Sequence, residues 1–450
     1  MIKKRKGFRF RLLPTQILVL GFAIIILIGT ILLALPIASV TGESIGILNA
    51  LFEATSAVCV TGLIVVDTAT ELTLFGQIVI ISLIQVGGLG FMTMATVIFL
   101  LLGKKITLKE RLVMQEALNR FSLEGIVRLT KKILYTTVLI EGLGALLLSI
   151  RFIPMFGLAR GMYYSIFHAI SAFCNAGFDL MGNYSSLTGF VYDPLINFVI
   201  SGLIIFGGLG FSVIFDIFSN FNYKKWTLHS KLAVSMTIAL VLIGMLFFLA
   251  VEYTNPQTLG RLNGEGKVLA SFFQSVTSRT AGFNTIDQSN LRDTSKFMTI
   301  LLMFIGASPA STGGGIKTVT AVVIFLMTIS VIKGKEDIEV SNKRIAKDIG
   351  NRALAIMFIN TSILIGGTMI LSIVEPYHFI DIMFEIGSAL GTVGLSSFDN
   401  ASLKIMSKVV VIIIMFAGRV GPLTLTSAIA KRQSRSLGEM KYPEARVMIG

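Results

Sequence analysis

The sequence predicts an all-α polytopic membrane protein, built from four helix–re-entrant helix–helix repeats around one pseudo-fourfold axis. Hydrophobic residues make up 54% of the 450-residue chain and charged residues only 14%, whereas an ordinary soluble domain has roughly 25% charged residues. This composition excludes a soluble multidomain enzyme. The net charge of +14 does not indicate a nucleic-acid-binding protein, because the basic residues stand in short blocks between long apolar stretches, as in chains oriented by a membrane.

Eight apolar stretches are long enough to cross a bilayer, since a spanning helix needs about 20 residues. They pair off along the chain, and a shorter apolar piece lies between the two members of each pair. That piece is too short to span the membrane and too apolar for an exposed loop, so we expect a re-entrant half-helix. The spanning stretches are 12–35, 72–102, 133–153, 192–218, 232–251, 297–332 (interrupted), 353–374 and 403–430, and the re-entrant pieces are 45–65, 162–178, 268–283 and 380–395.

The four predicted repeats occupy residues 1–102, 103–219, 220–332 and 333–430, and a tail of residues 431–450 follows. Lysine and arginine predict the orientation, because they are enriched on the cytoplasmic side of a membrane. The two termini and the connections between pairs hold 28 of the 39 basic residues, whereas the opposite side holds 8. We therefore expect a plasma-membrane protein with both termini cytoplasmic and re-entrant pieces that enter from outside.

Each re-entrant piece ends in a turn that contains a glycine, and the glycines are 115, 105 and 112 residues apart. A serine stands six residues before the glycine in three repeats, whereas the third repeat has Thr277 at five. These serines are Ser56, Ser171 and Ser388. The turn residues are Val60, Thr61 and Gly62 in the first repeat, Asn175, Ala176 and Gly177 in the second, Thr280, Ala281 and Gly282 in the third, and Thr392, Val393 and Gly394 in the fourth.

These turns have the chemistry of a cation site. Glycine adopts dihedral angles closed to other residues, so a carbonyl can point inward. A ring of carbonyl oxygens replaces the hydration shell of a monovalent cation, and half-helices entering from outside direct their partially negative C-termini toward it. Thr392, Val393 and Gly394 form the threonine-valine-glycine core of the potassium-channel filter. One such tripeptide is common by chance, but four at equivalent places predict a pore whose selectivity filter binds K⁺ at carbonyls.

The outgoing helix of each repeat carries a second set of glycines. For any one of them, close helix packing is a sufficient explanation. Four in equivalent places favour the inner wall of one pseudo-fourfold assembly around the pore. The set includes Gly87, Gly207, Gly306 and Gly418.

On these four turns the chain resembles the membrane subunit of the Trk/Ktr/HKT superfamily of potassium transporters, over residues 12 to about 430. The lack of extra helices before the first repeat makes it similar to the Ktr type. The resemblance implies K⁺ uptake, a homodimer and a cytosolic nucleotide-binding ring as regulatory partner. Glycine at all four filter positions implies a preference for potassium, because family members with serine at the first position tend to conduct sodium. It implies no covalently bound cofactor, and it leaves Na⁺ open as an activator.

A glycine-rich stretch interrupts the third outgoing helix. Proline removes a helix donor and glycine weakens a helix, so the helix must open at membrane depth, where free backbone groups need polar partners. Two structures fit, namely a kinked helix with a long cytoplasmic extension or a mobile loop across the pore. The resemblance implies the second, as an intramembrane gate. The residues are Gly306, Ala307, Ser308, Pro309, Ala310, Ser311, Thr312, Gly313, Gly314 and Gly315.

Three basic residues fall inside apolar regions. Arginine at membrane depth is usually functional or paired, so Arg419 either satisfies carbonyls of a neighbouring helix or faces the pore, bonds the gate loop and repels cations. The resemblance implies the second role, because the family has arginine at this place. Lys317 either caps a half-helix or faces cytosolic water. Arg279 is expected to brace the third turn from behind, through a carboxylate such as Glu53 or Glu385.

Two other function classes fit the sequence less well. A secondary transporter with broken helices uses two such segments in inverted halves, whereas the four repeats here have one orientation. An intramembrane enzyme needs a catalytic dyad or a metal set, and the sequence has no HExxH motif and no paired aspartates in apolar helices. We therefore expect a transport protein and no enzyme.

Overall fold

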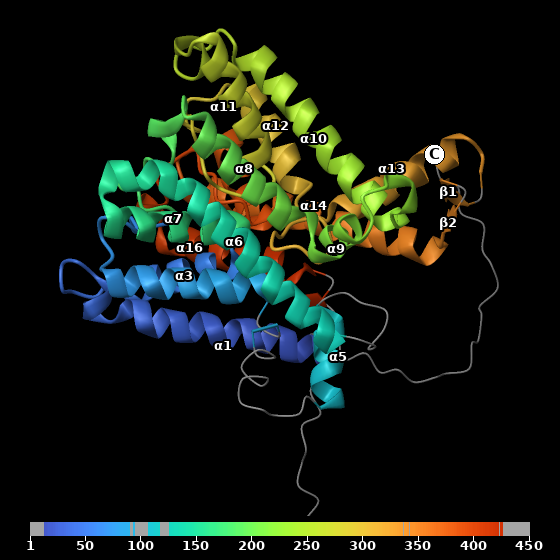
Figure 1. Ribbon diagram of the computed structural model, residues 1–450, viewed down its shortest axis with the longest axis horizontal. Coiled ribbons are helices and arrows are strands. Elements are labelled where there is room, and N and C mark those ends of the chain that lie inside the picture. Colours follow the sequence, from blue (N-terminus) through green and yellow to red (C-terminus); the bar gives the residue numbers. More distant parts are fainter. Residues whose placement is uncertain are drawn as a thin grey trace, which may run out of the picture.

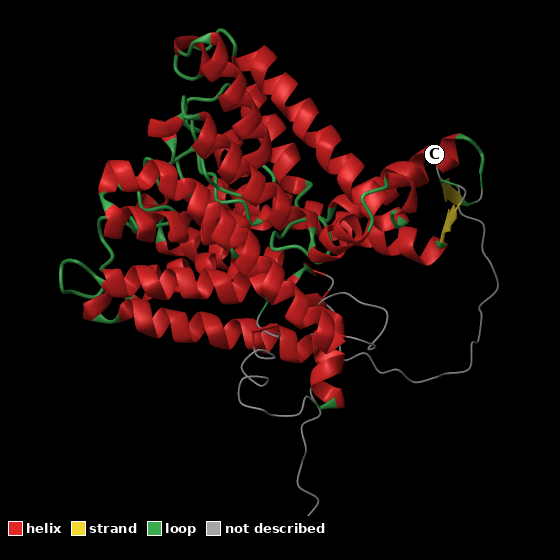
Figure 2. Cartoon of the chain, in the orientation of Figure 1, coloured by secondary structure: helices red, strands yellow, loops and turns green. Residues whose placement is uncertain are grey.

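A computed structural model of the chain places helices around a shared centre (Figure 1). The structure describes residues 13–90, 93–94, 107–117, 126–335, 337–341, 343–422 and 424–425. The basic N-terminal block, the predicted tail 431–450 and the far ends of stretches 72–102 and 403–430 lie outside the described residues. Figure 2 shows that the described residues are mostly helical, with connecting loops and one small hairpin.

The helices follow the predicted order in four units of incoming, short and outgoing helix. The incoming helices are α1 (Pro14–Ala34), α6 (Ile126–Phe156), α10 (Leu228–Glu252) and α14 (Lys347–Val374). The short helices are α2 (Ile47–Cys59), α7 (Leu158–Phe173), α11 (Gly264–Thr277) and α15 (Phe379–Gly391). The outgoing helices are α3 (Leu74–Leu89), α8 (Pro194–Leu209), α12 (Asp293–Phe304) and α16 (Ile405–Val420).

The incoming helices have the length and composition of membrane spans. In the described part of the chain, these four helices are each long and apolar enough to cross a bilayer by themselves. Only about a third of the most apolar part of α1 is buried in the protein, and Ile24, Leu27 and Ile31 are among its exposed side chains. Because these side chains are as apolar as lipid tails, the outer faces of the spans are suited to a bilayer.

The short helices form the centre of the protein. At about 1.5 Å per residue, the 13 residues of α2 reach roughly 20 Å, which is less than the roughly 30 Å of the hydrocarbon core. From Phe52 to its end, every residue of α2 is buried. Helix α16 of the last unit packs against α2 of the first, so the four units close on themselves, as the repeat pattern predicts.

The expectation of one continuous helix over residues 192–218 is wrong. Asp193 caps the start of α8 by accepting from the amides of Leu195 and Ile196, but α8 ends at Leu209. Helix α9 (Phe211–Ser219) continues at a bend of 99°. Gly210 between them has φ +85°, and the backbone amide of the next residue, Phe211, donates to the carbonyl of Ala310 at 3.0 Å. Residues of another unit therefore lie against the bend.

The third outgoing helix is interrupted as predicted, since α12 ends at Phe304 and α13 (Thr318–Ile332) resumes the chain. We call residues Gly306–Gly315 the interrupting loop. A parallel bridge joins Ile305 to Ile316 at its two ends. The predicted interruption therefore takes the form of a closed loop with paired ends rather than a kink.

Beyond α13 the chain forms a hairpin that the sequence analysis did not predict. Strands β1 (Ile338–Val340) and β2 (Lys343–Ile345) pair antiparallel, with Ile338 opposite Ile345. These two side chains are buried against α13 and α14, at the edge of the molecule in Figure 1. The remaining described elements are α5 (Leu108–Ala117) and the 3₁₀ turns η1 (Pro36–Ala38), η2 (Thr188–Phe190), η3 (Tyr223–Lys225), η4 (Leu259–Arg261) and η5 (Asn400–Ser402).

Candidate functional site

The four predicted turns lie next to one another in a closed ring, which we call the turn ring. A Cβ atom added to each turn glycine would collide with the carbonyl oxygen of the middle turn residue in the next unit, and the last unit meets the first. The pairs are Gly62 with Ala176, Gly177 with Ala281, Gly282 with Val393, and Gly394 with Thr61. A carbonyl group of each unit therefore lies beside the turn glycine of a neighbouring unit, where no side chain fits.

The backbone of the turn ring is strained in the same way in every unit. The φ angles of Gly62, Gly177, Gly282 and Gly394 are +91°, +71°, +85° and +95°. The residue two places earlier also has positive φ, with +56°, +60°, +73° and +50° at Val60, Asn175, Thr280 and Thr392. Three of these residues are β-branched, for which positive φ is an outlier and costs roughly 1–3 kcal/mol each. Strain that recurs at four equivalent places indicates a functional constraint.

The serines singled out in the sequence hold the turns from behind. In the first and fourth units, the serine hydroxyl accepts from the amide of the turn glycine. Ser56 Oγ lies 3.0 Å from the nitrogen of Gly62, and Ser388 Oγ lies 3.0 Å from that of Gly394. The amide of Gly62 is buried and that of Gly394 partly buried, so the serine supplies a partner that the turn needs.

In the second and third units the hydroxyl donates a hydrogen bond instead of accepting one. Ser171 Oγ donates to the carbonyl of Phe178 at 2.7 Å, and Thr277 Oγ1 donates to that of Phe283 at 2.5 Å. Thr277 thus takes the serine role despite its one-residue offset in the sequence. The turns are equivalent in shape, but the supporting hydroxyl accepts a hydrogen bond in the first and fourth units and donates one in the second and third.

A second polar residue in each short helix was missed by sequence reasoning. It is buried and bonds the chain that leaves the turn ring. The set is Glu53, His168, Gln274 and Glu385. Three of them stand nine residues before the turn glycine, so the alignment that revealed the serines also contained them. From the sequence, the two glutamates were instead expected to be partners of Arg279.

The interrupting loop lies directly against the turn ring. The amide of Gly314 donates to Thr392 Oγ1 at 3.1 Å, and Thr312 Oγ1 donates to the carbonyl of Phe173 at 3.0 Å. A Cβ at Gly313 would collide with the side chain of Thr280. The loop therefore contacts the second, third and fourth units at the ends of their short helices.

The end of α8 provides partners for the backbone of this loop. The amides of Ser308 and Thr312 donate to the carbonyls of Gly208 at 2.8 Å and Gly207 at 3.2 Å. The last carbonyls of a helix have no partner within it, so the bend after α8 leaves acceptors that the loop amides satisfy. Ser308 Oγ also lies 2.9 Å from Thr318 Oγ1. The loop is thus anchored at membrane depth rather than exposed.

Arg419 contacts both a neighbouring helix and the interrupting loop. Its guanidinium donates to the carbonyl of Thr312 in the interrupting loop, and to the carbonyls of Gly87 and, at 3.1 Å, Gly88 at the end of α3. It therefore satisfies carbonyls of a neighbouring helix and holds the loop as well. Lys317 Nζ donates to the carbonyl of Gly313 at 2.6 Å, so it fastens the far end of the same loop.

The expected partners of Arg279 are wrong. Its guanidinium lies between α8 and α10, where it makes two long hydrogen bonds to Thr237, of 3.4 Å to Oγ1 and 3.5 Å to the carbonyl. Its Nε has no partner in the described part of the chain. The carboxylate of Glu53 instead accepts from backbone amides of its own unit. Arg279 therefore points away from the short helices rather than toward their glutamates.

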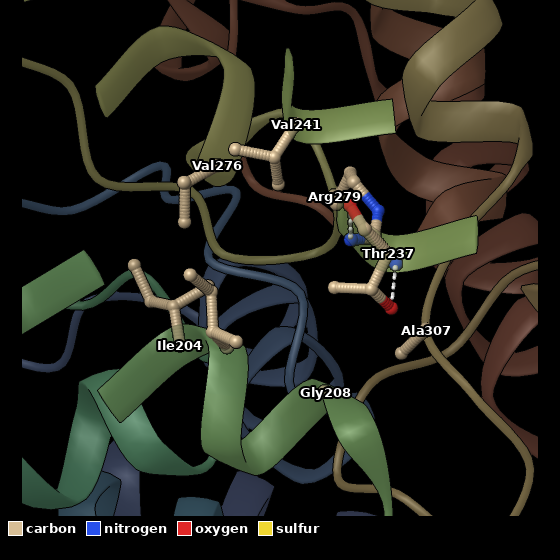
Figure 3. A pocket seen from close by; sticks show the side chains of 8 residues that line it. Ile204, Gly208, Thr237, Val241, Val276, Arg279 and Ala307 are labelled. Carbon is tan, nitrogen blue, oxygen red and sulfur yellow. Dashed lines mark hydrogen bonds between the residues drawn. The ribbon is translucent and has the colours of Figure 1, made fainter. Parts of the chain in front are cut away.

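A small cavity lies beside Arg279, and Figure 3 shows Thr237 and Val241 of α10 and Ile204 of α8 around it. Ala307 of the interrupting loop closes one side. The cavity leaves about 10 Å³ for the centre of a water molecule, which is about the space that one water needs. It is too small for a larger ligand.

The second set of glycines packs the outgoing helices onto the turn ring. At three of them a Cβ would collide with the carbonyl oxygen of the residue four places before a turn glycine. The pairs are Gly87 with Val58, Gly207 with Phe173, and Gly418 with Leu390. In the third unit Gly306 packs against Gly314 and Thr280 instead. The close packing of these glycines therefore brings the outgoing helices against the ends of the short helices around the ring. Only the unit with the interrupting loop departs from this pattern.

Comparison with known proteins identifies the family. A family model described as a cation transport protein, TrkH, matches residues 13–437. The chain belongs to this family. It is 45% identical to "Ktr system potassium uptake protein B" of Bacillus subtilis, over 98% of this chain and 97% of the relative. It is 41% identical to "Potassium/sodium uptake protein NtpJ" of Enterococcus hirae, over 99% of each.

A solved structure confirms the fold of this cation transport family member. The potassium transporter TrkH from Vibrio parahaemolyticus matches with a TM-score of 0.68 at 19% identity, and the match covers 90% of this chain and 84% of that one. The predicted multi-pass, four-repeat helical architecture is therefore correct. The repeat boundaries and the roles assigned to the turn ring and the interrupting loop stay predictions.

Proposed function

We propose that this chain carries K⁺ into the cell across the plasma membrane, with the turn ring as its selectivity filter. The observation that carries the proposal is the closed ring in which each turn glycine, at positive φ, packs against a carbonyl of the next unit. Two relatives that align over nearly the whole chain are named for potassium uptake and for potassium/sodium uptake. K⁺ is the cargo, bound at filter carbonyls, and Na⁺ is a candidate activator.

The chemistry of the ring supports a cation bound by backbone rather than by side chains. The middle turn residues are threonine, alanine, alanine and valine, which carry no charge. Helices α2 and α15 end at Cys59 and Gly391, directly before their turns. The partially negative C-termini of these helices face the ring, and carbonyl dipoles in a fixed ring replace the water around a monovalent cation.

Rubidium uptake with sodium competition tests the filter. Serine at Gly62, Gly177, Gly282 or Gly394 adds a Cβ where a neighbouring carbonyl already lies. We expect selectivity to fall in these variants before protein abundance does, because the carbonyl must leave the ring. Growth of a potassium-uptake-deficient strain on low potassium provides the second readout. Unchanged selectivity in all four variants would refute the filter.

We further propose that the interrupting loop is the gate. Its contacts with three turns, its glycine content and its anchors at Arg419 and Lys317 support a loop with two arrangements of similar energy. Deleting residues 308–313 should increase K⁺ flux into liposomes at matched protein amounts, and should make the flux less dependent on the cytosolic partner. Lower or equal flux with the fold intact would favour a purely structural loop.

Regulation and assembly complete the proposal. We infer a homodimer with both termini cytoplasmic, regulated by a cytosolic nucleotide-binding ring that docks on the basic connections. Reversing the charges of Lys104, Lys105 and Arg111 should weaken copurification with that partner and make it more sensitive to salt. Unaltered copurification at low salt places the docking surface elsewhere. Flux in liposomes with and without Na⁺ tests the activator.

A further inference from the structure

We propose that Glu53, His168, Gln274 and Glu385 form a brace that positions the filter, by fixing the chain just beyond each turn. The proposal rests on the turn ring being the filter. Each residue belongs to a different short helix, and each is at most 1% exposed. All four reach the segment that leaves the ring, although their side chains differ in chemistry.

The first two units make this contact at the same place. Glu53 Oε1 accepts from the amides of Val65 at 2.7 Å and Val66 at 2.9 Å. His168 Nε2 accepts from the amide of Leu180 at 3.4 Å. Val65 and Leu180 both stand three residues beyond their turn glycine. A carboxylate and an imidazole therefore have the same role, which is to accept a hydrogen bond from the backbone amide three residues beyond the turn glycine.

The tautomer of His168 follows from its two contacts. Its Nδ1 lies 2.7 Å from the carbonyl of Tyr164, and a carbonyl only accepts, so Nδ1 carries the proton. Nε2 is then the bare nitrogen that accepts from Leu180. The ring lies among the aromatic rings of Phe152, Phe167 and Phe283. The neutral form is thus the one that completes the brace in this unit.

The other two units use side-chain partners. Gln274 and Gln288 exchange two hydrogen bonds of 2.7 and 2.9 Å, and Gln288 also donates to the carbonyl of Ile286 at 2.9 Å. Glu385 Oε2 lies 2.7 Å from Ser396 Oγ, two residues beyond Gly394. Here the short helix is again joined to the segment directly after the turn.

Strain explains why a second support is needed. A residue keeps an unfavourable dihedral angle only where its surroundings over-determine it. The serine and threonine hydroxyls hold each turn at or next to its glycine, and the brace holds the chain two to six residues beyond that glycine. With both supports, the chain cannot relax the turn by shifting along its own axis. The brace therefore fixes where the filter carbonyls lie.

The structure provides the conservative substitution for a test. One carboxylate oxygen of Glu53 and one of Glu385 have no partner among the described residues. An amide group in that place removes no hydrogen bond, and Gln274 shows that glutamine serves the brace in the third unit. Glu53→Gln and His168→Gln keep an acceptor, whereas Glu53→Met and His168→Phe retain a similar shape without one.

The experiment measures rubidium uptake with sodium competition, on full-length protein at matched abundance. We expect the glutamine variants to keep the wild-type selectivity ratio within about twofold, and the methionine and phenylalanine variants to lose it by at least about tenfold. Equal ratios for the paired variants, whether both are unchanged or both are reduced, would overturn the brace. A merely structural role would lower abundance and the unfolding temperature without separating the pairs by selectivity.

A milder variant covers the case in which the methionine and phenylalanine variants do not fold. Ser396→Ala removes the hydroxyl that contacts Glu385 and leaves the short helix intact. Its selectivity ratio should fall at least about threefold, and a wild-type ratio would contradict the brace. The proposed function fails separately, since a wild-type protein without preference for rubidium over sodium would refute the filter itself. A selective wild type with unaffected brace variants refutes only the brace.

Discussion

Replacing Gly282 by alanine perturbs the turn ring through one added methyl group, and Gly46 is its matched control. Both glycines have φ +85°. Gly46 precedes α2, and nothing lies within 4 Å of the position of its Cβ. At Gly282 the same atom would lie 2.5 Å from the carbonyl oxygen of Val393 and 3.1 Å from Cα of Gly177. The two substitutions therefore share the dihedral strain but not the collision.

The structure gives the size of each effect. An unfavourable dihedral angle costs roughly 1–3 kcal/mol at either position. A carbon and a carbonyl oxygen normally approach to about 3.3–3.6 Å, so the carbonyl of Val393 must move by roughly 1 Å. A displacement of that size removes one ligand from a ring that works by close coordination. We expect both variants to lose stability, Gly282→Ala the more because the collision adds to the dihedral cost, and we expect a loss of selectivity of at least about tenfold in Gly282→Ala alone.

Thermal unfolding in detergent and rubidium uptake with sodium competition measure the two effects on the same preparations. Gly46→Ala should lower the unfolding midpoint by the dihedral cost alone, and Gly282→Ala should lower it further. Wild-type selectivity in Gly282→Ala would refute the reasoning, because the collision would then have been absorbed without moving the ring. An equal loss of selectivity in Gly46→Ala would refute it as well, because strain alone would then suffice.

Three further predictions concern the surroundings of the ring. Arg419→Ala should raise K⁺ flux into liposomes, because it removes both an anchor of the interrupting loop and a positive charge in a low-dielectric passage; equal or lower flux argues against a gate. Lys296→Met or Asp381→Asn should each destabilise the fold by roughly 3–5 kcal/mol, because each leaves one charge of a mostly buried 2.7 Å ion pair without its partner, and the double variant should be milder in thermal unfolding. Ser388→Ala should cost roughly 1–3 kcal/mol by leaving the amide of Gly394 without its partner; an unchanged unfolding midpoint would contradict this.

The sequence predicted the order of helices and the place of the interruption, because both depend on local properties. A membrane span requires a certain apolar length, and the stretch at residues 306–315 contains too much glycine, serine and proline to stay helical. The turn glycines were found for a similar reason, since an unusual dihedral angle restricts a position to one residue type. Repetition made these signals readable in four places.

The features that the sequence did not reveal depend on contacts between units. The amide that follows the bend at Gly210 bonds Ala310 of another unit, and no property of residues 192–218 encodes that neighbour. The sequence showed that Arg279 is a charged residue inside an apolar region, but the direction of its side chain depends on how α8 and α10 pack. His168 carried a usable signal, its position nine residues before the glycine, but glutamate fills that position in two other units and Gln274 stands eight residues before its glycine, which hides the common role.

The closed ring on a single chain has a consequence for symmetry. The interrupting loop already contacts three of the four turns, and Arg419 joins it to the end of α3 in the first unit. A copy of this loop in every unit would therefore compete for the same space. An assembly of four identical subunits has no way to keep one copy and omit three. Because the four units are parts of one chain, the sequence of each unit can change independently. One unit can therefore carry the loop that obstructs the pore, while the other three keep the shape of the ring.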